Sequence, residues 1–209
     1  MSFRRLLLPL TMSLLLLGAL LFAILTGNAS NSSGGGHSTQ VEAAGQGGFY
    51  GAELPEARPA PDFTLTDQYG HRLSLAELRG DPVILTFAYT NCGSTCKVIA
   101  QQIRGALAEL SHPPQVVMIS ADPRTDTPAA VRSFLASMSL TGLVHYLTGT
   151  EAELRPLWRA FRVAPGTEGR QAFSRYAFVM LLDSRGRERV LYSEEQLTPE
   201  AIAHDVKRL

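Results

Sequence analysis

The sequence feature that most constrains the fold is a nearly continuous apolar run, Val83–Tyr89, which leads directly into a cysteine pair and a helical pattern. A strand that is apolar on both sides must be covered on both faces of its sheet, as in α/β proteins. Val116–Ser120 is a second run of this kind, and helices are predicted behind Thr127, Thr150 and Thr198, whose side chains can cap them. The chain is therefore expected to form a central sheet flanked by helices.

The remaining apolar patterns set the order of the elements. Ala177–Asp183 and Arg189–Tyr192 flank a glycine-containing turn and predict a hairpin, while Phe63 and Leu65 mark one face of an earlier strand pair around Gly70. The predicted order is β-α-β-α-β-α-β-β-α, an α/β fold whose mixed central sheet is closed by a hairpin and a terminal helix. With a cysteine pair after the first central strand, this order is the thioredoxin-like arrangement.

The N-terminal end follows a different pattern. The run Leu6–Leu25 is about 20 residues without a charge, and a helix of that length spans the roughly 30 Å core of a bilayer. Arg4 and Arg5 precede this run, and the next Lys or Arg is Arg58. The positive-inside rule then predicts that residues 1–27 form a transmembrane signal anchor, with the following chain on the extracytoplasmic side, periplasmic or equivalent. A cleaved signal peptide is the alternative, although its apolar region would be shorter.

The segment after the predicted anchor is rich in Gly, Ser and Asn. Such a composition cannot build a core, so residues 28–58 are predicted to be a flexible tether. The tether leads to the thioredoxin-like domain, which is expected to occupy residues 59–209. The chain is thus divided into anchor, tether and domain.

Composition excludes some classes of function. The chain carries 19 basic and 19 acidic side chains, and this balance removes the electrostatic basis for a nucleic-acid partner. Its only two cysteines are Cys92 and Cys96. A disulfide between residues so close in sequence closes a short loop and adds little stability. A purely structural disulfide is therefore disfavoured.

The position of Cys92 and Cys96 favours a chemical role. Both stand where a buried strand gives way to a helix, and the positive end of a helix promotes ionisation of a thiol. A thiolate is the nucleophile of disulfide exchange and also a soft ligand for copper(I). The spacing is expected to bring both sulfurs onto one helical face, close enough to bond or to share a metal. We expect this helix start to be exposed, since Gly93, Ser94 and Thr95 separate the cysteines.

Three segments carry a resemblance to a known family. They are the Phe-x-Tyr-Thr-x-Cys-x-x-x-Cys motif from Phe87 to Cys96, the ADPRTDTPAAV segment Ala121–Val131, and AFVMLLDSRGR. With them the chain resembles the Sco/SenC family over nearly all of residues 60–209. These membrane-anchored thioredoxin-fold proteins help to assemble the dinuclear copper site of cytochrome c oxidase. The resemblance implies copper as a cofactor, held by Cys92 and Cys96, and an oxidase subunit or another cysteine-containing protein as partner.

The sequence departs from the family at the third copper ligand, which in the family is a histidine. Arg175 stands at the corresponding position, and a guanidinium offers no lone pair to a metal. Near the cysteine pair, Arg175 would instead stabilise a thiolate, so copper binding is expected to be weak or two-coordinate. Four histidines remain in the domain, and each is more typical of a structural or solvated residue: His71, His112, His145 and His204.

Three functions therefore remain open. The pair can act in assembly of the oxidase copper site, as a copper-delivery or a thiol-redox factor. Alternatively, the chain is a copper-independent thiol-disulfide oxidoreductase that acts on other extracytoplasmic proteins. A peroxidase is disfavoured, because Thr90 lies only two residues before Cys92 and the expected proline is missing. Asp122 and Asp126 are expected to bond turn and helix-start amides, although they could instead orient groups near the cysteines.

Overall fold

The computed structural model describes residues 48–165 and 177–209. The predicted anchor over residues 1–27, most of the predicted tether, and Arg175 lie outside the described residues. Within the described ranges, no helix is long and apolar enough to cross a membrane.

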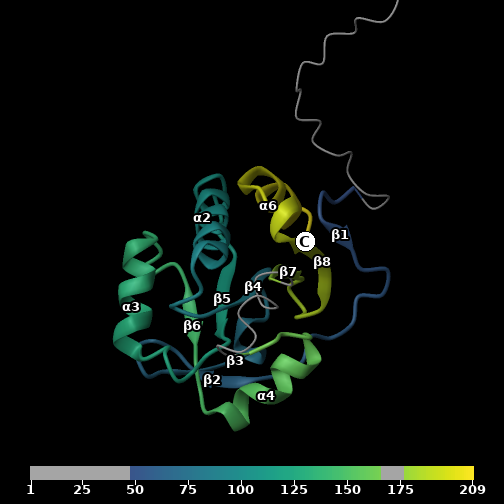
Figure 1. Ribbon diagram of the computed structural model, residues 1–209. Helices are drawn as coiled ribbons and strands as arrows, with labels where there is room; N and C mark the ends of the chain where they lie inside the picture. Colours follow the sequence, from purple (N-terminus) through teal and green to yellow (C-terminus); the bar gives the residue numbers. More distant parts are fainter. Residues whose placement is uncertain (1–47, 166–176) are drawn as a thin grey trace, which may run out of the picture. The chain divides into compact units, whose positions relative to one another are not determined.

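A mixed sheet forms the centre of the domain (Figure 1). In the described part of the chain it has six strands, in the spatial order β1-β8-β7-β4-β5-β6. Strands β4, β5 and β6 run parallel, whereas β7 is antiparallel to both of its neighbours. The strands are β1 (Ala52–Glu53), β4 (Val83–Ala88), β5 (Gln115–Ser120), β6 (His145–Leu147), β7 (Phe178–Leu182) and β8 (Glu188–Ser193). This topology confirms the predicted thioredoxin-like α/β fold.

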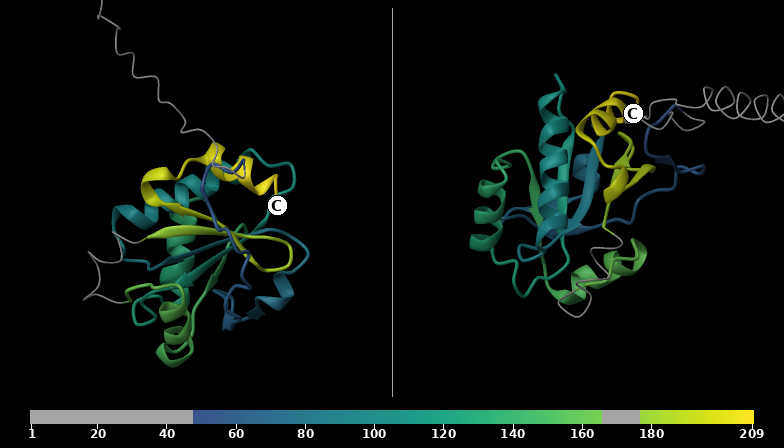
Figure 2. Two further views of the ribbon diagram at one scale, coloured as in Figure 1. Left: turned by 90° about the vertical axis from the view of Figure 1, so that its right-hand side faces the viewer. Right: turned by 45° about the horizontal axis from the view of Figure 1, so that its top comes forward.

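The apolar side chains of β4 suit its place between β7 and β5 in the sheet. All its residues are buried, as expected for a strand covered on both faces. Helices α2 and α6 lie side by side, and α4 lies across the sheet from them (Figures 1 and 2). The helices of the described residues are α2 (Ser94–Ala108), α3 (Pro128–Ser137), α4 (Glu151–Ala160) and α6 (Pro199–Val206), with short 3-10 turns η1 (Ala76–Leu78) and η3 (Glu194–Gln196).

The helix starts follow the predicted capping residues. Thr127 accepts a hydrogen bond from the Ala130 amide at 3.2 Å, and Thr198 accepts one from the Ala201 amide at 3.1 Å. Thr150 forms a reciprocal capping box at the start of α4. Each bond satisfies an amide that has no partner within its own helix. The small hairpin of β2 (Thr64–Thr66) and β3 (Arg72–Ser74) is also present as predicted.

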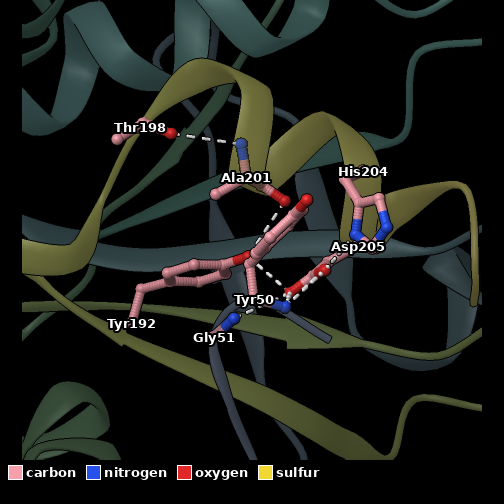
Figure 3. A network of polar contacts seen from close by, with 7 residues as sticks. All are labelled: Tyr50, Gly51, Tyr192, Thr198, Ala201, His204 and Asp205. Atoms are coloured by element: carbon pink, nitrogen blue, oxygen red, sulfur yellow. Dashed lines mark hydrogen bonds and ion pairs between the residues drawn. The ribbon is translucent and has the colours of Figure 1, made fainter. Parts of the chain in front are cut away.

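The domain begins earlier than the sequence pattern indicates. Phe49 is buried at 4% exposure, and β1 pairs with β8. The amides of Tyr50 and Gly51 donate to the carboxylate of Asp205 in α6, at 2.9 and 3.0 Å (Figure 3). The last part of the predicted tether over residues 28–58 therefore lies within the folded domain. Its own composition cannot form a core, but its contacts with β8 and α6 hold it in place.

Candidate thiol and metal-binding site

The cysteine loop, residues 89–93, contains Cys92 and connects the carboxyl end of β4 to α2. After Ala88 the chain turns, and the Cys92 amide donates to the Tyr89 carbonyl oxygen at 3.1 Å. Gly93 has a φ of 80° and stands immediately before the first residue of α2. Residues with a Cβ rarely adopt this backbone conformation, so the glycine allows the chain to turn from the strand into the helix between the two cysteines.

Cys92 and Cys96 are joined by a disulfide, with their Cα atoms 5.8 Å apart. The prediction of an exposed pair is wrong, because the two residues are only 6% and 3% exposed. Gly93 and Ser94 are exposed instead. The idea of a shared helical face also needs correction, since α2 begins at Ser94. Cys92 reaches Cys96 from the turn before the helix, which carries its side chain inward.

The start of α2 leaves a positive electrostatic environment for the sulfurs. The N-cap residue, Gly93, has no side chain to cap the first amides of this helix, and its first turn contains no acidic residue. These amides and the helix dipole favour negative charge. In the reduced protein they would stabilise a thiolate on either cysteine, which is the reactive form in disulfide exchange and metal binding.

A buried carboxylate holds the chain just before Cys92. Asp126 is 2% exposed, and its carboxylate accepts hydrogen bonds from the Thr90 amide at 2.7 Å, the Ser120 hydroxyl at 2.6 Å and the Tyr146 hydroxyl at 2.8 Å. Burial raises the pKa of Asp126 although these bonds oppose the shift. Asp126 therefore serves a turn amide, as expected, and because that turn carries Cys92, its carboxylate also lies where it can orient the cysteine loop.

Asp122 has a more local role. Its backbone oxygen accepts the amides of Thr125 and Asp126, both at 3.1 Å, and its carboxylate accepts a bond from Arg124 at 3.4 Å. The turn amides are thus held by the backbone oxygen of Asp122, so these bonds do not confirm the prediction that its carboxylate serves them. The carboxylate of Asp122 thus contacts a neighbour in its own loop, whereas that of Asp126 contacts residues of other segments.

The described histidines have other partners or surroundings. His71 lies 3.4 Å from the Asp67 carboxylate, and His204 lies 2.8 Å from that of Asp205. His112 neighbours Ser111 on the surface, and His145 lies on β6. Across residues 48–165 and 177–209, no three side chains of the His, Cys, Asp or Glu type gather as a metal site. Once reduced, the two sulfurs would form a soft donor pair of the kind that copper(I) prefers.

Comparison with known proteins identifies the family. The SCO1/SenC sequence profile matches residues 51–209, which includes the whole sheet, the cysteine loop and the terminal helix. The chain belongs to the SCO1/SenC family. This match begins at Gly51, close to the point where the structure shows the chain joining the sheet.

Individual relatives agree with this assignment. A Stutzerimonas stutzeri protein whose name refers to copper binding is 33% identical over 141 residues, covering 64% of this chain and 68% of the relative. The copper-bound structure of Bradyrhizobium japonicum ScoI is 28% identical, with a TM-score of 0.56 over 72% of this chain and 98% of that one. BsSco shares the fold at 24% identity, with a TM-score of 0.64 over 75% and 96% of the two chains. BsSco is described as a member of the Sco family of cytochrome c oxidase assembly proteins that contains a disulfide switch.

Proposed function

We propose that this Sco/SenC protein takes part in assembly of the cytochrome c oxidase copper site through Cys92 and Cys96, as a copper-delivery or thiol-redox factor. The observation that carries the proposal is the disulfide itself, placed at the start of α2, where the N-cap residue is a glycine. Two sulfurs that can bond each other can also exchange that bond with a partner or share one metal ion.

The family relationship supports the oxidase as the destination. BsSco belongs to the Sco family of cytochrome c oxidase assembly proteins, and the chain described here belongs to the same family. Copper appears in the name of the Stutzerimonas stutzeri relative and in the structure of Bradyrhizobium japonicum ScoI. We therefore assign copper the role of cargo, and an oxidase subunit or another cysteine-containing protein the role of partner.

The redox reaction is a two-electron exchange. A thiolate of the partner attacks one sulfur of the Cys92–Cys96 bond, which forms a mixed disulfide and releases the other sulfur as a thiolate. A second partner thiol then displaces the first sulfur. The partner leaves with a disulfide, and Cys92 and Cys96 remain as two thiols. Reversal of the same steps reduces a partner disulfide and re-forms the Cys92–Cys96 bond, so the direction depends on the two reduction potentials.

Copper binding requires the reduced pair. Cys92 and Cys96 would supply two thiolates, and the substitution of the family histidine by Arg175 favours weak or two-coordinate binding. Because a guanidinium cannot ligate a metal, Arg175→His is expected to increase copper(I) affinity. An affinity unchanged by this substitution would contradict the role assigned to Arg175.

A copper-independent thiol-disulfide oxidoreductase is the second candidate function. The same disulfide favours it, and so does Arg175, a residue that cannot ligate a metal, at the position of the family's third copper ligand. In both cases we propose that residues 1–27 anchor the domain to the membrane and that the domain faces the extracytoplasmic side. Labelling of the reduced pair by a membrane-impermeant maleimide in intact cells would test this placement.

One experiment separates the two functions. The reduced full-length chain in detergent is titrated with copper(I) against a competing chelator, and its disulfide is equilibrated with glutathione in parallel. Tight binding of one copper(I), lost in Cys92→Ser and Cys96→Ser but retained in the neighbouring Ser94→Ala, supports copper delivery. Reversible reduction without tight copper binding supports the oxidoreductase. A disulfide that neither exchanges nor binds copper when reduced would contradict both functions.

A further inference from the structure

The buried side chain of Asp126 ties the loop that carries Cys92 to the ends of two strands. Thr90 is two residues before Cys92, and its amide donates to Asp126 Oδ1 at 2.7 Å. The turn that follows is closed by the bond from the Cys92 amide to the Tyr89 carbonyl. Movement of Cys92 relative to α2 would therefore strain or break the Thr90–Asp126 hydrogen bond.

Asp126 is itself fixed by neighbours on other elements. Its Oδ2 atom accepts bonds from the Ser120 hydroxyl at the end of β5 and from the Tyr146 hydroxyl in β6. The Trp158 indole in α4 donates to the Ser120 carbonyl at 2.9 Å and extends this network. A carboxylate held by two hydroxyl groups cannot easily follow a moving loop, so it acts as a fixed point for Thr90.

We propose that Asp126 is a positioning residue for the Cys92–Cys96 pair. By holding the Thr90 amide it keeps Cys92 close to Cys96 and so favours the disulfide over the dithiol. This inference rests on the proposed thiol-disulfide chemistry, and it goes beyond it by naming the group that sets the balance between the two states.

The direction of the effect follows from proximity. The closing of a disulfide depends on the effective concentration of one thiol near the other, and a restrained loop keeps that concentration high. Reduction of the pair by two glutathione thiols breaks the Cys92–Cys96 bond and produces glutathione disulfide and two cysteine thiols. A loop released from Asp126 has more freedom in the dithiol state, so reduction becomes more favourable.

The test measures the equilibrium of the full-length chain with glutathione in wild type, Asp126→Ala and Asp126→Asn. Asp126→Ala is expected to favour the dithiol about tenfold, equivalent to about 30 mV for a two-electron couple. Asp126→Asn retains an oxygen that can accept from Thr90, so it is expected to restore most of the wild-type equilibrium. If the asparagine variant shifts as far as the alanine variant, the carboxylate charge rather than the position matters, and the proposal is overturned.

Asp205→Ala is the matched control, because Asp205 is also buried and accepts bonds from two backbone amides and a tyrosine hydroxyl. It is expected to lower stability without changing the glutathione equilibrium. An equal shift in Asp205→Ala would assign the effect to general loosening of the domain and would overturn the proposal.

Tyr146→Phe guards against misfolding of the alanine variant, since it removes only one hydroxyl from the network. It is expected to shift the equilibrium in the same direction by about threefold, equivalent to about 15 mV. No shift in any folded variant would overturn the proposal. A wild-type disulfide that cannot be cycled by glutathione would instead contradict the proposed thiol function itself.

Discussion

Asp126 and Asp205 are both almost completely buried. Asp126 accepts hydrogen bonds from one backbone amide and Asp205 from two, and each also accepts one from a tyrosine hydroxyl, yet they connect different parts of the domain. Asp126 joins the cysteine loop to the ends of β5 and β6. Asp205 joins residues 50 and 51 to α6, with Tyr192 of β8 between them (Figure 3). The comparison shows that two buried aspartates with similar hydrogen bonds hold different segments in place. The position of the amide that each one accepts determines whether it holds the cysteine loop or the N-terminal edge of the domain.

The Asp205 region is expected to show the largest loss of stability. Asp205→Ala leaves the amides of Tyr50 and Gly51 without their acceptor and should lower the free energy of unfolding by about 3 kcal/mol, at about 1–3 kcal/mol for each unsatisfied buried group. Urea denaturation measures this loss. Hydrogen exchange should show lost protection at both amides, and full protection in the variant would contradict the assigned role.

Gly93→Ala tests the cysteine loop by a different route. The space around Gly93 is open, so the cost arises from its φ of 80° and should be about 1–3 kcal/mol. Gly142→Ala is the matched control, because Gly142 has a φ of 77° and open surroundings in another loop. Both variants should lose similar stability in urea denaturation, but only Gly93→Ala should change the glutathione equilibrium. A redox change in both would show that the cysteine loop has no special sensitivity.

The dependence of stability on pH should differ between Asp126, whose pKa is raised, and an aspartate whose pKa is lowered. Burial raises the pKa of Asp126 from its ordinary value of 3.8, so the folded state holds the proton more strongly than the unfolded state does. Wild-type stability relative to Asp126→Asn should therefore be largest below pH 3.8 and fall as the pH rises through the folded-state pKa.

Asp67 provides the opposite slope for this measurement. Its pKa is lowered from 3.8, because hydrogen bonds from His71 and Tyr69 outweigh the effect of burial. The stability that Asp67 contributes should be present above pH 3.8 and be lost as the pH falls through the folded-state pKa. Urea denaturation of the wild type, Asp126→Asn and Asp67→Asn from pH 3 to pH 7 would show whether the two aspartates change stability with pH in opposite directions. Parallel slopes would contradict the assignment for Asp126.

His204 should contribute the smallest effect. Its Nδ1 atom lies 2.8 Å from Asp205 Oδ1, and its ring lies 4.3 Å from that of Tyr50. Because the side chain is partly exposed and Asp205 keeps its buried donors, His204→Ala should cost only about 0.5 kcal/mol in urea denaturation. His71→Ala, which removes a more exposed histidine beside Asp67, should cost no more. A loss above that of Gly93→Ala would show that His204 is essential to this region.

Local signals in the sequence predict most of the fold. The apolar runs at Val83–Tyr89 and Val116–Ser120 become β4 and β5, and Thr127, Thr150 and Thr198 cap the helices expected of them. These features depend on residues within one turn or one strand of each other. The position of the cysteines between β4 and α2 could be predicted for the same reason.

Long-range contacts could not be predicted in this way. The Tyr50–Asp205 contact joins residues 155 positions apart. The composition around Tyr50 is typical of a tether, and nothing in it indicates that a distant aspartate accepts its amide. The Thr90–Asp126 bond, 36 positions apart, is concealed because an aspartate in a turn has nearer amides to serve. Burial of Cys92 depends likewise on the turn at Gly93. Cysteine spacing indicates the chemistry of the site but not its accessibility.

The contacts around Asp205 also determine how the domain responds to mechanical load. Chain N-terminal to residue 48 joins the domain at Phe49–Glu53, so tension applied through it acts first on β1 and on the hydrogen bonds to Asp205. The cysteine loop is held by a separate set of bonds around Asp126. A pull on the N-terminal chain would therefore load the edge of the sheet and α6 before it reached the Cys92–Cys96 disulfide.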